Sequence, residues 1–450
     1  MKMKKIFLLA ALACISCTQV RQQALDEDVI GRLRENAGET ACEVLKSKDM
    51  LKACLDESVI SSTDTNCTYR VNTRGITDQM ESGRCWLFST LNVLRAEMIM
   101  DYDMEDFEFS QTYGQFWDVL EKSNRFLENV IEYRKEPVDS RMNEWLFKKP
   151  IGDGGHFANA AHIISKYGVV PQEIMPEVHS STDNLRLMNV VRTLLRRYGL
   201  MLRDADRKDI QAVKEKGLSD IYRVLALNLG EPPTSFTWAL KDKDGNIVDE
   251  KEYTPASFRD RFVRHDLEND YVILMDDPTR PYYKMYAVDN SRNCFELANW
   301  TFLNVPATEL GAIGVESLKG GRMFYFSCDT AQDALMTEGI YDTDLYDLEG
   351  ILGVSFDMTK EELVRSCEIK SYHAMAMAGV EVDKEGKPVK WVVENSFGTV
   401  RGWDGFVVID GEWFDKYMFR MAVERRFVPD NLLPLLDQKP KLLKSWNPTY

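Results

Sequence analysis

One cysteine stands where a nucleophile would be expected. Residues 78–95 read DQMESGRCWLFSTLNVLR, with a turn at Ser82-Gly83 directly before an apolar pattern of helical period. Cys85 therefore falls in the first helical turn, where unpaired backbone N–H groups and the helix dipole favour an anion. The pattern predicts a lowered pKa for the Cys85 thiol and a reactive sulfur. The alternative interpretation is an inert buried thiol, the usual role of an isolated cysteine.

A reactive cysteine needs a base, and residues 371–398 offer a histidine. Strand-like alternation starts at His373, a turn follows at Asp383–Gly386, and a second strand leads to Asn395. A hairpin on this turn places His373 opposite Asn395 to within one residue, where facing Cβ atoms lie about 5 Å apart. The amide oxygen can then bind one ring nitrogen and leave the other for the cysteine. The alternative is a pair of ordinary polar residues on a hairpin.

An oxyanion donor is also at hand. Gln79 precedes Cys85 on the loop that leads into the helix, so its side-chain amide and the Cys85 backbone N–H could together hold a developing negative charge. Phe397, just after Asn395, could shield the histidine–asparagine contact from water. Four side chains of the required types therefore occur in one chain.

Composition excludes several other functions. The 450 residues include 56 Lys and Arg against 72 Asp and Glu, a net charge of −16, which argues against nucleic acid as a partner. No H-E-x-x-H, G-x-x-x-x-G-K-[ST] or G-x-G-x-x-G motif occurs, so neither a metal nor a cofactor is expected. Cys42, Cys54 and Cys67 could include a disulfide pair, whose connectivity the sequence does not give.

The first residues, MKMKKIFLLAALACISC, have the form of an export signal. A basic start is followed by an apolar stretch too short to span a bilayer. Residues 1–17 are therefore expected to be a signal peptide with a lipobox, and Cys17 to be lipidated, with Cys14 as the weaker candidate. The alternative is cleavage after a small residue, which gives a soluble periplasmic protein. The expected location is periplasmic or membrane-anchored, with the lipid as a possible membrane partner.

The remaining chain divides by pattern into three further segments. Residues 18–60 are expected to form a tether and a helical extension, and residues 61–230 a helical half that carries the nucleophile and a helical insertion. Residues 231–450 read as a strand-rich half that carries the histidine and asparagine and ends in a C-terminal arm. A hairpin is expected to turn at Asp244-Gly245.

The order Gln79, Cys85, His373, Asn395 resembles that of papain-type cysteine peptidases. More narrowly, the chain resembles the bleomycin hydrolase and bacterial aminopeptidase C family, because SGRCWLF, HAMAMAGV and WVVENSFG are similar to its nucleophile, histidine and asparagine segments. The resemblance covers roughly residues 25–450 and includes non-catalytic blocks: FSQTYGQFWDVLEKSNRFLE, GDGG, KYGVVPQEIMPE, LNLGEPP, GIYDTDLYD and EWFDKYMFRMAVERRFVP.

The resemblance implies an α+β, papain-like fold with a helical left half, a β-barrel right half, a helical insertion and a hook-like oligomerisation element. It implies a cysteine aminopeptidase that acts on peptide substrates through a thioester and assembles as a homohexamer. Carried over by position, Cys85 is the nucleophile, His373 the base and acid, Asn395 the group that orients it, and Gln79 the oxyanion donor. Gly154 and Gly155 would offer backbone to the substrate.

The chain departs from the family in four places. It carries an export signal, it has Phe397 where tryptophan is usual, and His156 stands where glutamine is common. In the family the terminal carboxylate lies in the cleft and receives the substrate's amino group, a role that would fall here to Tyr450. Only Thr449 and Tyr450 follow Trp446-Asn447-Pro448, so a papain-like endopeptidase or dipeptidase stays open. A third alternative is an inert, lipid-anchored binding protein.

Overall fold

The computed structural model describes residues 24–37 and 43–447, which fall into two compact units that divide between Cys54 and Leu55. The first unit contains three helices: α1 (Glu27–Ala37), α2 (Glu43–Ser47) and α3 (Met50–Cys54). The predicted signal peptide with Cys14 and Cys17, and the predicted substrate-binding residue Tyr450, lie outside the described residues. Within the described ranges no helix is long and apolar enough to cross a membrane.

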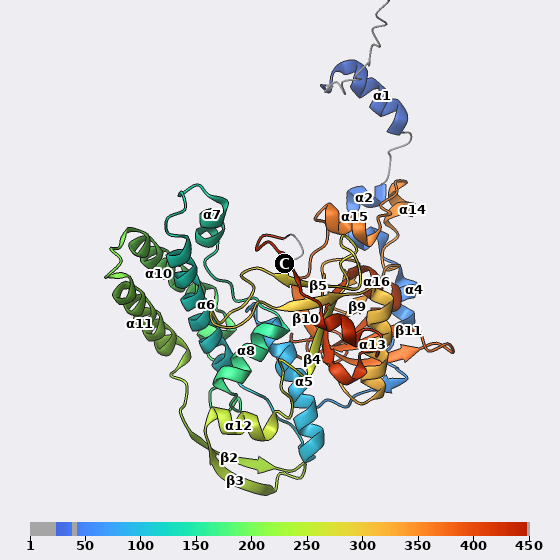
Figure 1. Cartoon of the computed structure of the whole chain (residues 1–450). Helices are drawn as coiled ribbons and strands as arrows, with labels where there is room; N and C mark the ends of the chain where they lie inside the picture. Colours follow the sequence, from blue (N-terminus) through green and yellow to red (C-terminus); the bar gives the residue numbers. More distant parts are fainter. Residues whose placement is uncertain (1–23, 38–42, 448–450) are drawn as a thin grey trace, which may run out of the picture. The chain divides into compact units, whose positions relative to one another are not determined.

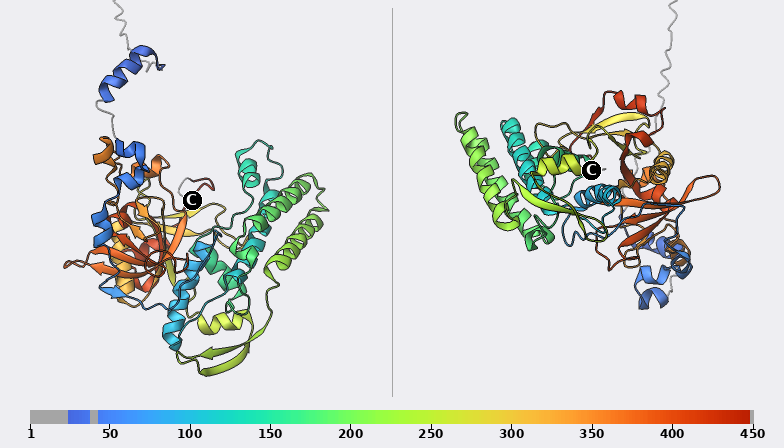
Figure 2. Two further views of the ribbon diagram at one scale, coloured as in Figure 1. Left: turned by 180° about the vertical axis from the view of Figure 1, so that it is seen from behind. Right: turned by 90° about the horizontal axis from the view of Figure 1, so that it is seen from below.

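The second unit contains the candidate site and begins with a helical region. Its described helices run as follows: α4 (Glu57–Ser62), α5 (Cys85–Tyr102), α6 (Gln111–Tyr133), α7 (Arg141–Lys148), α8 (Phe157–Tyr167), α9 (His179–Thr182), α10 (Leu185–Asp204), α11 (Ile210–Leu229), α12 (Pro255–Phe262), α13 (Ala307–Lys319), α14 (Leu348–Leu352), α15 (Lys360–Arg365) and α16 (Gly411–Tyr417). Short 3-10 helices η1 (Arg425–Phe427) and η2 (Leu433–Asp437) follow. Helices α6, α10 and α11 pack together on the side away from the sheet (Figures 1 and 2).

One mixed sheet forms most of the second half. Its order is β14-β5-β6-β4-β13-β7-β10-β11-β12-β9-β8, and β1 pairs with β10. The strands are β1 (Tyr69–Arg70), β4 (Tyr271–Met275), β5 (Lys284–Val288), β6 (Thr301–Asn304), β7 (Phe324–Cys328), β8 (Ala334–Leu335), β9 (Ile340–Tyr341), β10 (His373–Val382), β11 (Pro388–Glu394), β12 (Phe406–Asp410), β13 (Met418–Glu424) and β14 (Lys441–Leu443). A separate hairpin, β2 (Phe236–Lys241) with β3 (Ile247–Tyr253), turns where the sequence predicts it.

Helix α5 lies between two hydrophobic cores. Every residue from Cys85 to Ile99 is buried, including the polar and charged side chains among them. Leu87 and Leu91 belong to the core of the helical region, whereas Val93 and Ala96 belong to the core of the sheet. The helix packs against β10 and β7 on one side and against α6 and α8 on the other. The start of α5 is thereby brought to the sheet.

Small residues and an ion pair hold this packing. Strand β10 alternates alanines at 374, 376 and 378 with methionines, and alanines allow a close approach of helix and strand. Farther along the helix, the Arg95 guanidinium pairs with Glu394 at the end of β11, and both side chains are at most 3% exposed. The helix that carries the candidate nucleophile is therefore fixed to the strand that leads to Asn395.

Candidate active site

A cleft of 780 Å³ contains most of the residues singled out from the sequence. Gln79, Cys85, Gly154, Gly155 and His373 all line it. Asn395 lies behind His373 and is 3% exposed. Residues that are 294 positions apart in the chain, 79 and 373, are thus gathered at one place because α5 packs against β10.

Cys85 occupies the first residue of α5. The preceding Arg84 does not cap the helix with its side chain, so the first N–H groups of the helix are left for other acceptors. The sulfur accepts hydrogen bonds from the backbone N–H groups of Trp86 and Ala374. Because Ala374 directly follows His373, the second of these bonds places the sulfur beside the start of β10.

His373 is held from two sides. Its Nε2 lies 3.0 Å from Asn395 Oδ1, and the same oxygen accepts the Ser396 backbone N–H at 2.8 Å. Phe397 stacks on the imidazole with ring centroids 4.9 Å apart. An amide oxygen can only accept, so Nε2 carries the hydrogen and Nδ1 of the neutral ring keeps a lone pair.

The predicted pairing of the hairpin needs a correction. Ala376 pairs with Glu394, which by continuation places Asn395 diagonal to His373 and not directly opposite. The turn is closed by hydrogen bonding between Asp383 and Lys387, one residue beyond the predicted turn. A register shift between Met377 and Gly379 adds to the difference. The contact still forms, because diagonal neighbours on one face of a sheet lie within reach of long side chains.

Burial sets the protonation of the resting pair. It raises the pKa of the Cys85 thiol to about 11, against the smaller lowering effect of hydrogen bonds from Ala374 and Trp86. Burial also lowers the pKa of His373 to about 4, although the bond to Asn395 acts the other way. The expectation of a lowered thiol pKa is therefore wrong for the resting site, because loss of hydration outweighs the helix start. At neutral pH the pair is a thiol beside a neutral imidazole.

Gln79 is buried at 5% exposure and its amide is held at both ends. Nε2 donates to the Ser82 carbonyl oxygen at 2.6 Å, and Oε1 accepts the Ser396 hydroxyl at 2.6 Å. A carbonyl oxygen cannot donate, so this arrangement fixes which end of the amide is nitrogen. One N–H of Gln79 remains for a group in the cleft.

Two glycines are required by close contacts beside the nucleophile. A Cβ at Gly155 would lie 2.7 Å from the Trp86 indole, and one at Gly83 would lie 2.7 Å from the Asp153 carboxylate. Asp153 also accepts the Gly83 N–H at 2.7 Å. Gly154 has open space around it, and its carbonyl accepts from Lys122 Nζ at 2.7 Å. Substrate binding by Gly154 and Gly155 stays a prediction.

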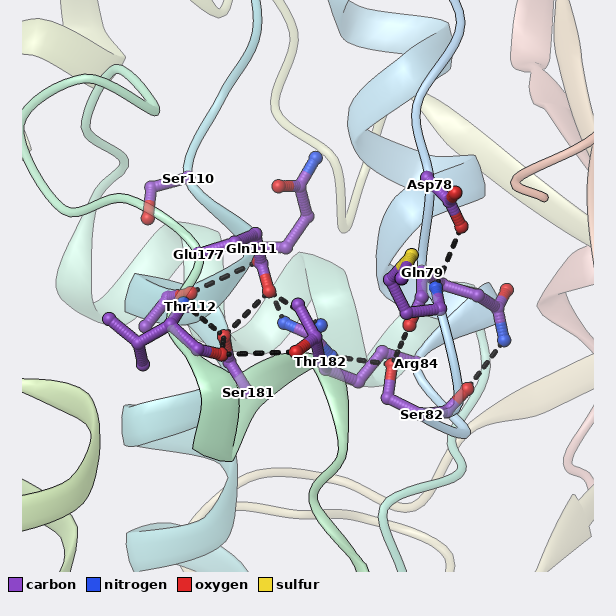
Figure 3. Close-up of polar contacts among 12 residues, drawn as sticks. Asp78, Gln79, Ser82, Arg84, Ser110, Gln111, Thr112, Glu177, Ser181 and Thr182 are labelled. Atoms are coloured by element: carbon purple, nitrogen blue, oxygen red, sulfur yellow. Dashed lines mark hydrogen bonds and ion pairs between the residues drawn. The ribbon is translucent and has the colours of Figure 1, made fainter. Parts of the chain in front are cut away.

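The sequence reasoning missed the groups behind the cysteine. Arg84 is 1% exposed, and its guanidinium binds both carboxylate oxygens of Glu177, at 2.9 and 2.7 Å (Figure 3). The signal was present as a charged residue directly before the apolar run CWLF, where a buried cation requires a partner. His156, Trp300 and Arg420 also line the cleft. Among the cysteines proposed to pair, Cys67 is a free thiol, and Cys42 lies outside the described residues.

A cysteine at a helix start, set against a histidine–asparagine pair on a sheet, defines a papain-like cysteine peptidase. The chain belongs to the Peptidase C1-like family, whose model matches residues 22–449. It is 35% identical to aminopeptidase C of Listeria monocytogenes over 94% of this chain and 96% of that protein. It is 32% identical to bleomycin hydrolase of Gallus gallus over 91% of this chain and 93% of that protein.

A solved structure shares the architecture. The crystal structure of PepW from Lactobacillus rhamnosis superposes with a TM-score of 0.91 at 31% identity, over 95% of this chain and 98% of that one. The predicted family and the predicted α+β, papain-like fold are therefore confirmed.

The pKa of His373 predicts an acid sensitivity. In the unfolded chain the histidine protonates near 6.5, but in the folded protein only near pH 4, so the unfolded state gains protons first as the pH falls. The contribution of the neutral His373 to the free energy of unfolding is complete above about pH 6.5 and is lost as the pH falls toward 4. Between pH 7 and pH 5 the wild type should lose about 2 kcal/mol more unfolding free energy than His373→Gln. Urea denaturation at both pH values measures this difference, and equal losses would contradict it.

Proposed function

We propose that the protein is a cysteine-type aminopeptidase that removes N-terminal residues from peptides, with Cys85 as the nucleophile. The observation that carries the proposal is the His373 ring at the start of β10, whose Nε2 hydrogen is bound by Asn395 and whose Nδ1 keeps its lone pair, while the Cys85 sulfur accepts the N–H of the next residue, Ala374. The names of the relatives, aminopeptidase C and bleomycin hydrolase, support the same class of reaction.

The first half of the proposed reaction forms a thioester. As the Cys85 sulfur attacks the carbonyl carbon of the N-terminal residue, its proton moves to His373 Nδ1, and the carbonyl electron pair moves onto oxygen. Gln79 Nε2–H and the Cys85 backbone N–H bind that oxyanion. The oxyanion then collapses, the C–N bond breaks, and the imidazolium returns its proton to the leaving amine. Proton transfer at the moment of attack suits a pair that is neutral at rest.

The second half returns the enzyme to its starting state. Water gives a proton to His373 Nδ1 and attacks the thioester carbon, and the same two donors bind the second oxyanion. The C–S bond breaks, the sulfur regains its proton from the imidazolium, and the free amino acid leaves. Asn395 keeps the ring in one tautomer through both halves because its oxygen accepts only from Nε2.

Loss of the sulfur should abolish turnover. Cys85→Ala is expected to lower kcat for aminoacyl fluorogenic substrates by more than about a thousandfold, since attack and acylation both need it. Cys67→Ala removes a free thiol elsewhere and serves as the matched control. Full activity of Cys85→Ala would refute the proposal. A wild type that binds peptides without hydrolysing them, and resists thiol alkylation, would favour the inert binding protein.

The C-terminal arm supports exopeptidase action. Strand β14 pairs with β5, and the following Ser445 lines the cleft. Trp446 lies under the Arg141 guanidinium of α7, 4.6 Å from ring centroid to Cζ, and Asn447 accepts from Arg280 at 2.7 Å. The arm is thus held by α7 and by the segment between β4 and β5, next to the residue that lines the cleft. We infer that the arm and the residues after it, Tyr450 included, restrict the cleft to the ends of peptides.

A displaced arm should relax this restriction. The wild type is expected to cleave free peptides at least tenfold faster than the same peptides with an acetylated N-terminus. Trp446→Ala removes the ring under Arg141. It should lower the ratio of the cleavage rates of free and acetylated peptides, mainly because the acetylated peptides are cleaved faster. Initial rates measured with each peptide pair give the ratio. If the wild type cleaves both forms equally well, the endopeptidase alternative is correct.

We also propose export, lipidation at Cys17 and assembly into a homo-oligomer, a hexamer by analogy with the family. The signal-like residues 1–17 support the first two proposals, and the resemblance supports the third. In a cell fractionation, the wild-type protein should be found in the membrane fraction and the Cys17→Ser variant in the soluble fraction. Light scattering of this released form should give a multiple of the chain mass. A Cys17→Ser protein that stays in the membrane fraction would contradict lipidation, and a monomer would contradict assembly.

A further inference from the structure

A continuous path of hydrogen bonds runs behind the candidate nucleophile, from Glu177 to Gln79 (Figure 3). Arg84 binds Glu177 with Nη1 and Nη2, and its Nε donates to the Ser82 hydroxyl at 2.9 Å. The Ser82 hydroxyl in turn donates to the Gln79 backbone carbonyl at 2.6 Å. Apart from Glu177, whose side chain is 17% exposed, every side chain on this path is at most 5% exposed.

The far end of the path is anchored by other elements. Glu177 accepts the Thr112 hydroxyl of α6 at 3.0 Å and the Ser181 hydroxyl of α9 at 2.7 Å. Four donors, two of them from Arg84, therefore hold one carboxylate in place. The planar Arg84 guanidinium binds Glu177 through Nη1 and Nη2 and Ser82 through Nε, so it fixes Ser82 relative to Glu177. A lysine ammonium has no such rigid fork.

The near end of the path fixes the oxyanion donor. Ser82 contacts Gln79 twice, through its hydroxyl to the backbone carbonyl and through its carbonyl to the side-chain Nε2. The second contact, together with the Ser396 hydroxyl on Oε1, fixes which end of the Gln79 amide is nitrogen and leaves one N–H of Nε2 for the oxyanion. A loop that moved Ser82 would release both contacts and leave the Ser396 hydroxyl as the one described side-chain partner of the Gln79 amide.

We propose that Arg84, Ser82 and Glu177 are positioning residues for the oxyanion site, acting through Gln79. This inference rests on the proposed function. A buried ion pair contributes little stability compared with apolar residues of similar volume, because both charges lose their hydration. Its value here is geometric: it connects the loop of residues 78–84 to α6 and α9 and presets the donor before substrate arrives.

The mildest test removes one hydroxyl. Ser82→Ala should lower kcat about tenfold with KM changed less than twofold, because the donor matters in the transition state and not for binding. Gln79→Ala should lower kcat by a hundredfold to a thousandfold. The double variant should be no slower than Gln79→Ala alone, since Ser82 acts only through that amide. Alkylation of Cys85 by iodoacetamide needs no oxyanion donor and should keep the wild-type rate in all three.

A second variant and a control complete the design. Arg84→Lys keeps the charge but loses the planar fork, and should repeat the Ser82→Ala pattern. Ser317 of α13 lies outside the cleft, and its equally buried hydroxyl donates to the Arg322 carbonyl at 3.0 Å. Ser317→Ala removes this hydroxyl and should leave kcat unchanged. Thermal unfolding of each variant shows that it is folded.

The outcomes separate the two claims. Ser82 and Gln79 effects that multiply in the double variant, or alkylation that slows together with kcat, would overturn the positioning role. A fully active Gln79→Ala would also overturn it, because the path acts through that amide, whereas a wild type without turnover would overturn the proposed function itself.

Discussion

The site depends on the packing of α5 against β10. A helix start supplies N–H groups and a strand start supplies an imidazole, but neither does chemistry until the two ends meet. They meet because α5 is buried from Cys85 to Ile99 and lies between two cores, which leaves its first residue at the boundary where the cleft opens. The Arg95–Glu394 ion pair fixes the other end of the contact and adds a constraint on β11, whose next residue is Asn395. One helix thus determines the positions of nucleophile, base and orienting group.

The same burial that brings these groups together decides their charge. A helix start on a protein surface favours a thiolate, but Cys85 is only 8% exposed, and desolvation favours the neutral thiol. His373 responds to burial in the corresponding way and stays unprotonated. The two effects are complementary: the thiol needs a base, and the ring is a base with a free lone pair. Separation of charge is then postponed to the reaction, where the oxyanion and the imidazolium appear together.

Much of this could be predicted from the sequence, and the failures have physical causes. The Gly83 turn before an apolar run located the α5 start, and the alternation around His373 located β10. The predicted register of the hairpin, with His373 opposite Asn395, is wrong. Turn length and register shifts depend on hydrogen bonds that no residue pattern specifies. The predicted lowering of the Cys85 thiol pKa is wrong because the shift depends on burial by the tertiary structure. The Arg84–Glu177 pair was missed because its members are 93 residues apart and neither belongs to a catalytic motif by type.

A resting pair without charge places a particular demand on the loop before α5. If the resting pair were a thiolate and an imidazolium, attack would only move negative charge from sulfur to oxygen, and the number of charges in the cleft would stay the same. When the pair is neutral, attack creates both charges at once at two groups that are themselves buried, so donors must already face the oxygen. Side chains that turned only after attack would act too late. The path from Glu177 to Gln79 meets this demand, since it fixes the amide through Arg84 and Ser82, which are at most 4% exposed. The neutral pair and the rigid loop are therefore two parts of the same arrangement.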